Sequence, residues 1–165
     1  MLRDDTSPHR PHCAFDESGS RDGSLKALPP FCANCACVDE CRFRAGIISE
    51  NCPVTGSDLK SLQGSGLSDR FYSWRGVSGA RHICRIVPIE MESVIGQFSK
   101  VLAIGARRSG QQVRPVCFIL SDEFNAPAGY RMRRHAASHG CSEWHLYFED
   151  QPQKVRDLTL SLGLA

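Results

Sequence analysis

The sequence predicts a small α+β domain over residues 71–165, with a mixed or antiparallel sheet and two helices near its C-terminal end. Three observations predict this class. Short segments rich in β-branched and aromatic residues recur between turn residues, helix-boundary residues flank two later segments, and the residues before position 71 lack both patterns. At about 95 residues, this part of the chain is long enough to bury a core of its own.

The first predicted elements form a β-hairpin. Phe71–Trp74 is a short aromatic strand, a turn with two glycines follows it, and Ala80–Ile89 supplies the second strand. Residues 90–98 predict one or two helical turns, interrupted by Gly96.

Two more strands are expected at residues 100–106 and 113–121, joined by the polar connection 107–112. The second of them is apolar almost throughout. A continuous apolar run of this kind suits a strand that is covered on both faces of the sheet.

Helix-boundary residues mark the two helices. Asp122 or Asn125 is the expected N-cap of the first, with Pro127 in its first turn and Gly140 just past its end. The second begins near Pro152, and its apolar face comprises Val155, Leu158, Thr159 and Leu162.

Between these helices, alternating residues from Glu143 to Glu149 predict a half-buried strand. The residues expected to face inward are Trp144, Leu146 and Phe148, and those expected to face outward are His145 and Tyr147.

The first 70 residues differ in composition from the predicted domain. Residues 1–30 are rich in Asp, Ser, Pro, Gly and Arg and bury too little apolar surface to offset the entropy cost of ordering, so we expect disorder there. Residues 31–52 form a Cys-rich segment, and residues 53–70 are punctuated by Gly and Ser in the manner of a linker. The domain is therefore expected to follow a disordered, Cys-rich N-terminal segment.

Charge and cysteine usage bear on partners and location. The net charge is +2, but residues up to 70 sum to −2 and residues from 71 onward to +4. A basic domain favours an anionic partner such as nucleic acid, with ordinary surface charge as the alternative. The charged first ten residues do not resemble a secretory signal, and no apolar stretch is long enough to span a membrane. With nine cysteines, these features predict a reducing, cytoplasmic location.

Four segments in order resemble the GIY-YIG nuclease superfamily, and most closely its short, divergent bacterial members. They are WRGVSGAR at 74–81, VLAIGARR at 101–108, PVCFIL at 115–120 and RMRRHAASHGCSEWHL at 131–146. The resemblance covers roughly residues 72–163 and lies in the order and spacing of the segments. It implies a nuclease fold in which two strand tyrosines, a helix arginine and a glutamate on the last helix act on phosphodiesters with a divalent cation.

The residues at those positions depart from the family pattern. The first tyrosine falls on Ala103 or Ile104, and the second falls on Cys117 or Phe118, with Ile119 or Leu120 where the glycine belongs. None of these side chains can activate water. The sequence therefore predicts a degenerate member of the superfamily without nuclease activity.

The metal-binding helix position is also replaced. The glutamate falls near Val155, which has no oxygen ligand for a hard cation. Asp157 could supply a carboxylate, but two residues away on a helix it is expected to face in another direction. Arg131 matches the helix arginine of the family.

Five cysteines lie in residues 31–52, at the spacing Cys32-x2-Cys35-x-Cys37-x3-Cys41 followed by Cys52. A Cys-x2-Cys pair can direct two thiolates at one ion, and tetrahedral zinc needs two more ligands. The predicted zinc ligands are Cys32, Cys35, Cys41 and Cys52, with Cys37 spare. An iron–sulfur cluster and a reduced segment without metal are the alternatives.

The densest basic group of the predicted domain comprises Arg107, Arg108, Arg131 and Arg134, with Arg133 beside them. Arg131 and Arg134 are neighbours on one helix face and could grip phosphates together. His135 and His139 are four residues apart and could chelate zinc, or be polar residues that the helix C-terminus favours. A solvated charged face is the alternative for the arginines.

These patterns predict a non-catalytic binding module whose partner is nucleic acid. The alternative is a protein-interaction or redox regulatory protein that uses the cysteine cluster. An enzyme that relies on other residues is the third reading.

Overall fold

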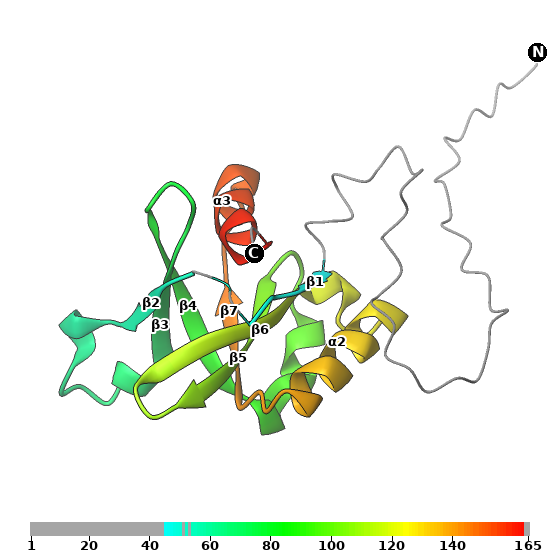
Figure 1. Ribbon diagram of the computed structural model, residues 1–165, viewed down its shortest axis with the longest axis horizontal. Coiled ribbons are helices and arrows are strands. Elements are labelled where there is room, and N and C mark those ends of the chain that lie inside the picture. The colour runs from blue at the N-terminus through cyan, green and yellow to red at the C-terminus, as the bar shows by residue number, and fades with distance from the viewer. Residues whose placement is uncertain (1–44, 51, 53, 164–165) are drawn as a thin grey trace, which may run out of the picture.

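The computed structural model describes residues 45–50, 52 and 54–163. They form a curled seven-stranded sheet in the order β1-β6-β5-β7-β4-β3-β2, in which every neighbouring pair is antiparallel. The predicted α+β class is confirmed (Figure 1). Residues 1–30 and most of the Cys-rich segment lie outside the described residues. No helix among the described residues has the length and apolarity that crossing a membrane would require.

The strands are β1 (Ala45–Ile47), β2 (Gly56–Asp58), β3 (Phe71–Arg75), β4 (Arg81–Pro88), β5 (Leu102–Ser109), β6 (Gln112–Leu120) and β7 (Glu143–Tyr147). The α-helices are α2 (Pro127–Ser138) and α3 (Pro152–Gly163), and the 3-10 helices are η1 (Lys60–Leu62), η2 (Ser68–Arg70), η3 (Ile89–Gln97) and η4 (Ser121–Glu123).

The five strands predicted from residue 71 onward are present. β5 continues three residues beyond its expected end, and β6 begins one residue earlier than expected. Arg107 and Arg108, assigned to a polar connection, lie in β5 and pair with Arg114 and Val113 of β6. The turn is tight because Gly110, with φ of 61°, adopts the left-handed conformation that glycine tolerates. The polar residues therefore continue the hairpin beyond the point where its apolar pattern stops.

The sheet also begins earlier than residue 71. β1 pairs with β6, and β2 pairs with β3. The sequence assigned Ala45–Ile47 to the Cys-rich segment and Gly56–Asp58 to the linker, since three-residue strands of small and polar residues carry no periodic signal. Gly56 lies against the rings of Tyr72 and Trp74, where a side chain would not fit, so tertiary packing places this strand.

Helix boundaries agree with the sequence except at the N-cap of α2. Pro127 is its first residue, and Gly140, with φ of 70°, follows its end. Ala126 takes the N-cap position in place of Asp122 or Asn125. The Asn125 side chain instead packs against Gly96 of η3, and the carboxylate of Asp122 accepts the backbone N–H of Lys100.

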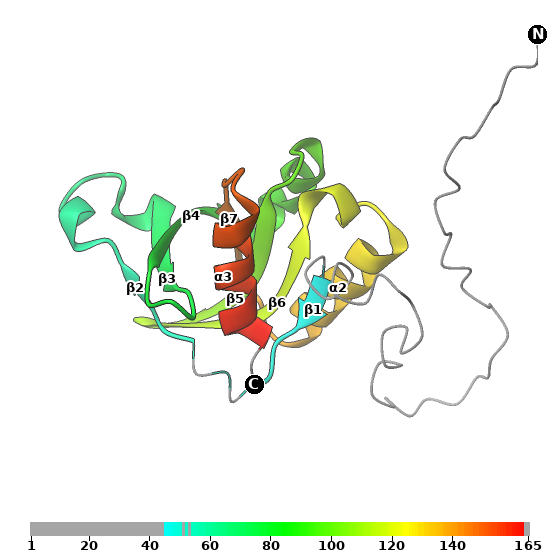
Figure 2. The same cartoon turned by 90° about the horizontal axis from the view of Figure 1, so that it is seen from above.

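Two apolar cores lie on opposite faces of the sheet. On one face, η3 and α2 cover a core that includes Val87, Ile119, Met132, Trp144 and Leu146. On the other, α3 inserts Leu158 and Leu162 against a core that includes Tyr72, Trp74, Leu102, Ile104 and Phe118. Figure 2 shows α3 between the β2–β3–β4 part of the sheet and the β1–β6 part. Burial of residues 116–119 of β6, with Leu120 half-buried, confirms the expectation of a strand covered on both faces.

The expectation that β7 is half-buried was wrong. His145 is fully buried and Tyr147 is buried, whereas Phe148, expected to face inward, is 49% exposed. β7 is the middle strand of the order, and α3 covers the face that the sequence assigned to solvent. Phe148 follows the last paired residue of β7 and extends beyond the η3–α2 core.

A chain of polar contacts, the clamp, runs through Trp74, His145, Glu143, Arg108 and Asp58. Trp74 Nε1–H donates to Nδ1 of His145 (3.0 Å), so the imidazole proton resides on Nε2, which donates to Glu143 (2.8 Å). Arg108 binds the same carboxylate through Nε (3.0 and 3.1 Å) and Nη2 (3.0 Å), and its Nη1 lies 3.6 Å from Asp58.

The clamp connects β3, β7, β5 and the edge strand β2. Asp58 of β2 and Arg108 of β5 are separated by three strands in the sheet order, so their contact requires the sheet to curl. Arg108 also lies over the ring of Tyr72, 5.8 Å from its centroid. Although burial opposes it, hydrogen bonds from His145 and Arg108 lower the pKa of Glu143 and keep the central carboxylate ionised.

The clamp predicts acid sensitivity of the fold. Burial lowers the pKa of His145 below its ordinary value of 6.5, so below that pH the unfolded chain binds a proton that the folded chain excludes. The free energy of unfolding should therefore fall as the pH drops from 6.5 to 5, by up to about 1.4 kcal/mol per pH unit. Urea unfolding followed by tryptophan fluorescence at each pH measures it.

His145→Gln is the matched control, because its amide can accept from Trp74 and donate to Glu143 without titrating. The difference between wild type and this variant in the pH slope isolates His145 from the other histidines. If the free energy of unfolding depended on pH equally in the two proteins, burial of His145 would not be the cause of the acid sensitivity.

Candidate nucleic-acid interface

The four arginines predicted to bind nucleic acid do not share one surface. Arg107 and Arg108 are neighbours on β5, so their side chains lie on opposite faces of the strand. Arg108 belongs to the clamp, and its guanidinium is bound to Glu143 and Asp58. Arg107 is exposed. Of this pair, Arg107 is the one that presents its charge to solvent.

Arg131 and Arg134 lie on α2, as expected. Arg134 is exposed, and its guanidinium lies 6.0 Å from the centroid of the exposed Tyr130 ring. Arg131 is half-buried. Neither residue lines the groove that contains Arg107, so the pair would extend an interface at that groove across the outer side of α2.

The structure forms a groove of about 680 Å³ where β6, the end of α2 and the segment between β1 and β2 meet. Its basic residues are Arg107, Arg114, His135 and His139, and Glu50 is the one acidic residue among the described residues that line it. Tyr72 of β3 lines the same groove, because the curl of the sheet brings β3 toward β6. We call this feature the basic groove.

Arg107 and Arg114 face each other directly across β5 and β6. Both are exposed, and no carboxylate of a described residue forms an ion pair with either. Like charges directly opposite in an antiparallel pair destabilise a sheet. An anion bound between them would relieve that repulsion. A neighbouring hollow of about 480 Å³ is lined by both residues as well.

Arg107 also lies at the C-terminal end of α2. Its Cδ atom is 3.5 Å from the position that a Cβ of Gly140 would take. The negative end of the helix dipole stabilises a cation there. The side chain is thereby held at the border of the groove.

His135 and His139 face each other on the last turn of α2, as their spacing predicted. Their ring centroids are 3.9 Å apart with 35° between the planes, and Nδ1 of His139 lies 2.9 Å from the carbonyl oxygen of His135. Nδ1 of His139 also lies 3.0 Å from the hydroxyl of Ser138, so this nitrogen is engaged within the last turn of the helix. Burial, with the adjacent His139, lowers the pKa of His135.

The positions at which the sequence resemblance led us to expect nuclease tyrosines lie in the two cores. Ala103, Ile104 and Cys117 are fully buried, and Phe118 is buried. Val155 of α3 is half-buried against the α3-side core. These positions hold no oxygen group that could ligate a hard cation.

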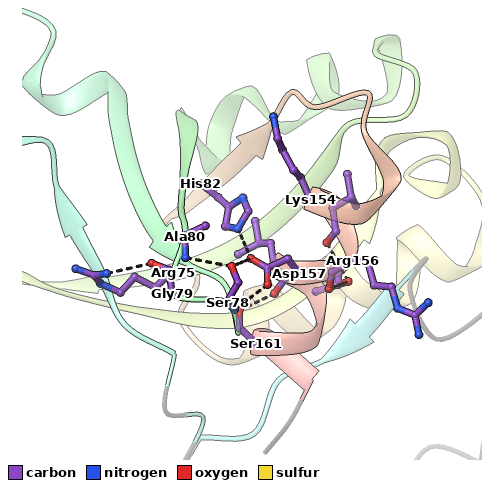
Figure 3. Close-up of polar contacts among 12 residues, drawn as sticks. Arg75, Ser78, Gly79, Ala80, His82, Lys154, Arg156, Asp157 and Ser161 are labelled. Atoms are coloured by element: carbon purple, nitrogen blue, oxygen red, sulfur yellow. Dashed lines mark hydrogen bonds and ion pairs between the residues drawn. The ribbon is translucent and has the colours of Figure 1, made fainter.

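Asp157 faces the β3–β4 hairpin and forms a latch with Ser78 and His82 (Figure 3). Its Oδ1 accepts the backbone N–H of Ser78 (2.8 Å), and its Oδ2 lies 2.8 Å from both Ser78 Oγ and His82 Nε2. Gly76 leaves the space, since a Cβ there would collide with the carboxylate. Although burial opposes it, hydrogen bonds from His82 and Ser78 lower the pKa of Asp157.

The latch continues to Tyr147, whose hydroxyl lies 2.9 Å from Nδ1 of His82. A hydroxyl, an imidazole and a carboxylate in series have the connectivity of a nucleophilic triad, beside a pocket of about 590 Å³. Burial and the nearby Glu149, however, raise the pKa of Tyr147. The phenol therefore stays protonated, and the series fixes α3 to the sheet more readily than it activates a nucleophile.

Of the predicted zinc ligands, Cys52 is described, and Cys32, Cys35 and Cys41 lie outside the described residues. The Sγ atom of Cys52 lies 3.6 Å from the carbonyl oxygen of Ser161 and 3.7 Å from that of Leu162, at the end of α3. Burial raises the pKa of Cys52, which disfavours the thiolate in this position. The described residues contain no group of three or more potential metal ligands.

No protein-family model matches the chain, and no curated protein or solved structure is detectably similar to it.

Removing the latch carboxylate should destabilise the fold. Asp157→Ala leaves the Ser78 N–H and the buried His82 without their acceptor, at a cost of about 1–3 kcal/mol in the free energy of unfolding. Glu90→Ala removes the same charge from an exposed residue and should cost less than about 0.5 kcal/mol. Urea denaturation compares the two, and equal stability would mean that the latch does not fasten α3.

Proposed function

We propose that this chain is a non-catalytic binding module that holds nucleic acid by its phosphates at the basic groove. The observation that carries the proposal is the directly opposed pair Arg107 and Arg114, two exposed cations with no carboxylate of a described residue to neutralise them. A phosphate backbone supplies anions at regular spacing and would bridge such a pair. A cytoplasmic location belongs to the same proposal.

Cationic and amide side chains at one end of the groove support an anionic ligand. Arginine, histidine and glutamine side chains lie beside Val113, Pro115 and Val116 in the part formed by β5, β6 and α2. Among these, Gln111 and Gln112 can donate to phosphate or sugar oxygens, whereas arginine supplies the charge. Such contacts position a nucleic acid without reading its sequence.

The absence of catalysis in the proposal rests on the replaced positions. Buried Ala103, Ile104 and Cys117 stand where the resemblance to GIY-YIG nucleases requires tyrosines, and Val155 stands where it requires the metal-binding glutamate. Asp157, the nearest carboxylate in sequence, is held by the latch. We therefore expect binding without cleavage, with the degenerate superfamily fold as part of the proposal.

Neutralising the opposed pair tests the proposal. The full-length chain and its Arg107→Gln/Arg114→Gln variant are titrated into labelled single- and double-stranded oligonucleotides across a salt series, with fluorescence anisotropy as the readout. The variant should bind at least about tenfold more weakly, and the slope of log Kobs against log salt should become shallower by about two. The loss should be similar for all base sequences.

Arg75→Gln/Arg81→Gln is a matched control, since these arginines are directly opposed across β3 and β4 and lie outside the basic groove. The control removes the same charge and should retain the binding of wild type. Equal losses in both variants would indicate a net-charge effect and contradict the groove. Cleavage of the oligonucleotide in Mg²⁺ would contradict the non-catalytic assignment.

Zinc in the Cys-rich segment is a separate part of the proposal. Full-length protein purified anaerobically should contain about one zinc per chain by elemental analysis, and Cys32→Ser/Cys35→Ser should lose it. Cys84→Ser, which changes a buried core thiol, is the control and should retain it. Iron in place of zinc would favour an iron–sulfur cluster, and metal-free protein would contradict the proposal that this segment binds a metal.

A further inference from the structure

The sheet has a second basic surface in addition to the basic groove. It lies on the η3–α2 side of β3 and β4, beyond the area that those helices cover. On this face Arg75 of β3 and Arg81, Ile83 and Arg85 of β4 are exposed, whereas Phe71 is half-buried and Ser73 is buried. We call it the hairpin face.

An apolar centre distinguishes the hairpin face. Ile83 is 54% exposed and Phe148 is 49% exposed. Arg85 pairs with Leu146, so these two residues lie on the same face of the sheet. Ile83 is two residues from Arg85 and Phe148 is two residues from Leu146, and residues two apart along a strand share a face. Ile83 and Phe148 therefore lie on the same face as well. Phe98, at the end of η3, packs edge-to-face on Phe148 with 5.2 Å between ring centroids. Two exposed apolar side chains, Ile83 and Phe148, therefore lie on one face of the sheet.

Three arginines surround this centre. Arg75 and Arg81 are directly opposed, and Arg85 lies two residues from Ile83. None of them forms an ion pair with a carboxylate of a described residue. Arg75 donates to the carbonyl oxygen of Gly79 (3.1 Å) and extends away from the latch, as Figure 3 shows.

An apolar centre with an arginine rim has the composition of a protein-binding surface. A second copy of the chain would set these arginines against one another, which like charges disfavour. Nucleic acid would leave the aliphatic Ile83 without a matching group. Carboxylates pair with the planar guanidinium through two hydrogen bonds, and an apolar stripe on the same partner would cover Ile83 and Phe148.

We propose that the hairpin face docks an acidic, amphipathic segment of a partner protein, independently of nucleic-acid binding at the basic groove. Ile83 and Phe148 bury against the apolar side of that segment, and Arg75, Arg81 and Arg85 pair with its carboxylates. The interaction weakens with salt through the arginines and with loss of apolar area through Ile83.

The probe is a synthetic amphipathic helical peptide with leucine on one face and glutamate elsewhere, compared with poly-glutamate of equal length. Full-length protein with ¹³C-labelled isoleucine methyl groups is titrated with each and observed by NMR. The amphipathic peptide should shift Ile83 progressively, leave the fully buried Ile104 unchanged, and bind at least about fivefold more tightly than poly-glutamate.

Two variants locate the contact. Arg75→Gln/Arg81→Gln should weaken the amphipathic peptide at least about fivefold, and Arg107→Gln/Arg114→Gln should leave it unchanged. Ile83→Ser should weaken it as well, with folding checked by the spectrum of the remaining methyl groups. Each arginine pair thereby serves as the control for the other surface.

Several outcomes would overturn the proposal. Equal affinity for poly-glutamate would show that the apolar centre contributes nothing. Loss of peptide binding in the Arg107 and Arg114 variant would move the contact to the basic groove. Concentration-dependent dimers in sedimentation that Ile83→Ser abolishes would identify the face as a self-association surface, and an oligonucleotide that shifts Ile83 would identify it as part of the nucleic-acid interface.

Discussion

The clamp from Trp74 to Asp58 is the constraint on which the remaining architecture depends. A seven-stranded antiparallel sheet can stay open, but the contact of Arg108 with both Glu143 and Asp58 requires the edge strand β2 to approach β5. Both ring nitrogens of His145 are hydrogen-bonded within the clamp, and these bonds offset the free-energy cost of burying a polar side chain in an apolar interior. The resulting curl encloses α3 on one face and leaves η3 and α2 to cover the other.

The basic groove is a consequence of that curl. Tyr72 of β3 and Val113 of β6 line one hollow although three strands lie between β3 and β6 in the sheet order, and this happens only in a curled sheet. The guanidinium of Arg108 is engaged in the ion pairs of the clamp. The adjacent Arg107 and its cross-strand neighbour Arg114 form the exposed pair. The same residue run thus supplies one cation to the fold and one to the proposed interface. On the opposite end of the sheet, Arg75 and Arg81 repeat the unrelieved pair beside an apolar centre.

The sequence predicted the elements that have a local residue pattern. Alternation, Pro127 and Gly140 located the strands and helices from residue 71 onward, and continuous apolar residues identified β6 as covered on both faces. It missed β1 and β2, whose short polar strands exist through pairing and through Gly56 packing on aromatic rings. It also placed His145 in solvent, because a polar side chain becomes a core residue only when Trp74 and Glu143, 71 and two residues away, satisfy both nitrogens. The sequence did not indicate Arg114 as a binding residue, because its pairing with Arg107 depends on the register of β5 and β6.

We have proposed that the curled sheet binds nucleic acid at the basic groove. The most direct measurement is a ¹H–¹⁵N chemical-shift map of the full-length chain titrated with an unlabelled oligonucleotide at low salt. Binding at the basic groove should give the largest shifts in residues 107–114 and 135–140, and these shifts should diminish together as salt is raised. Shifts centred on residues 75–85, or none at any salt concentration, would contradict it.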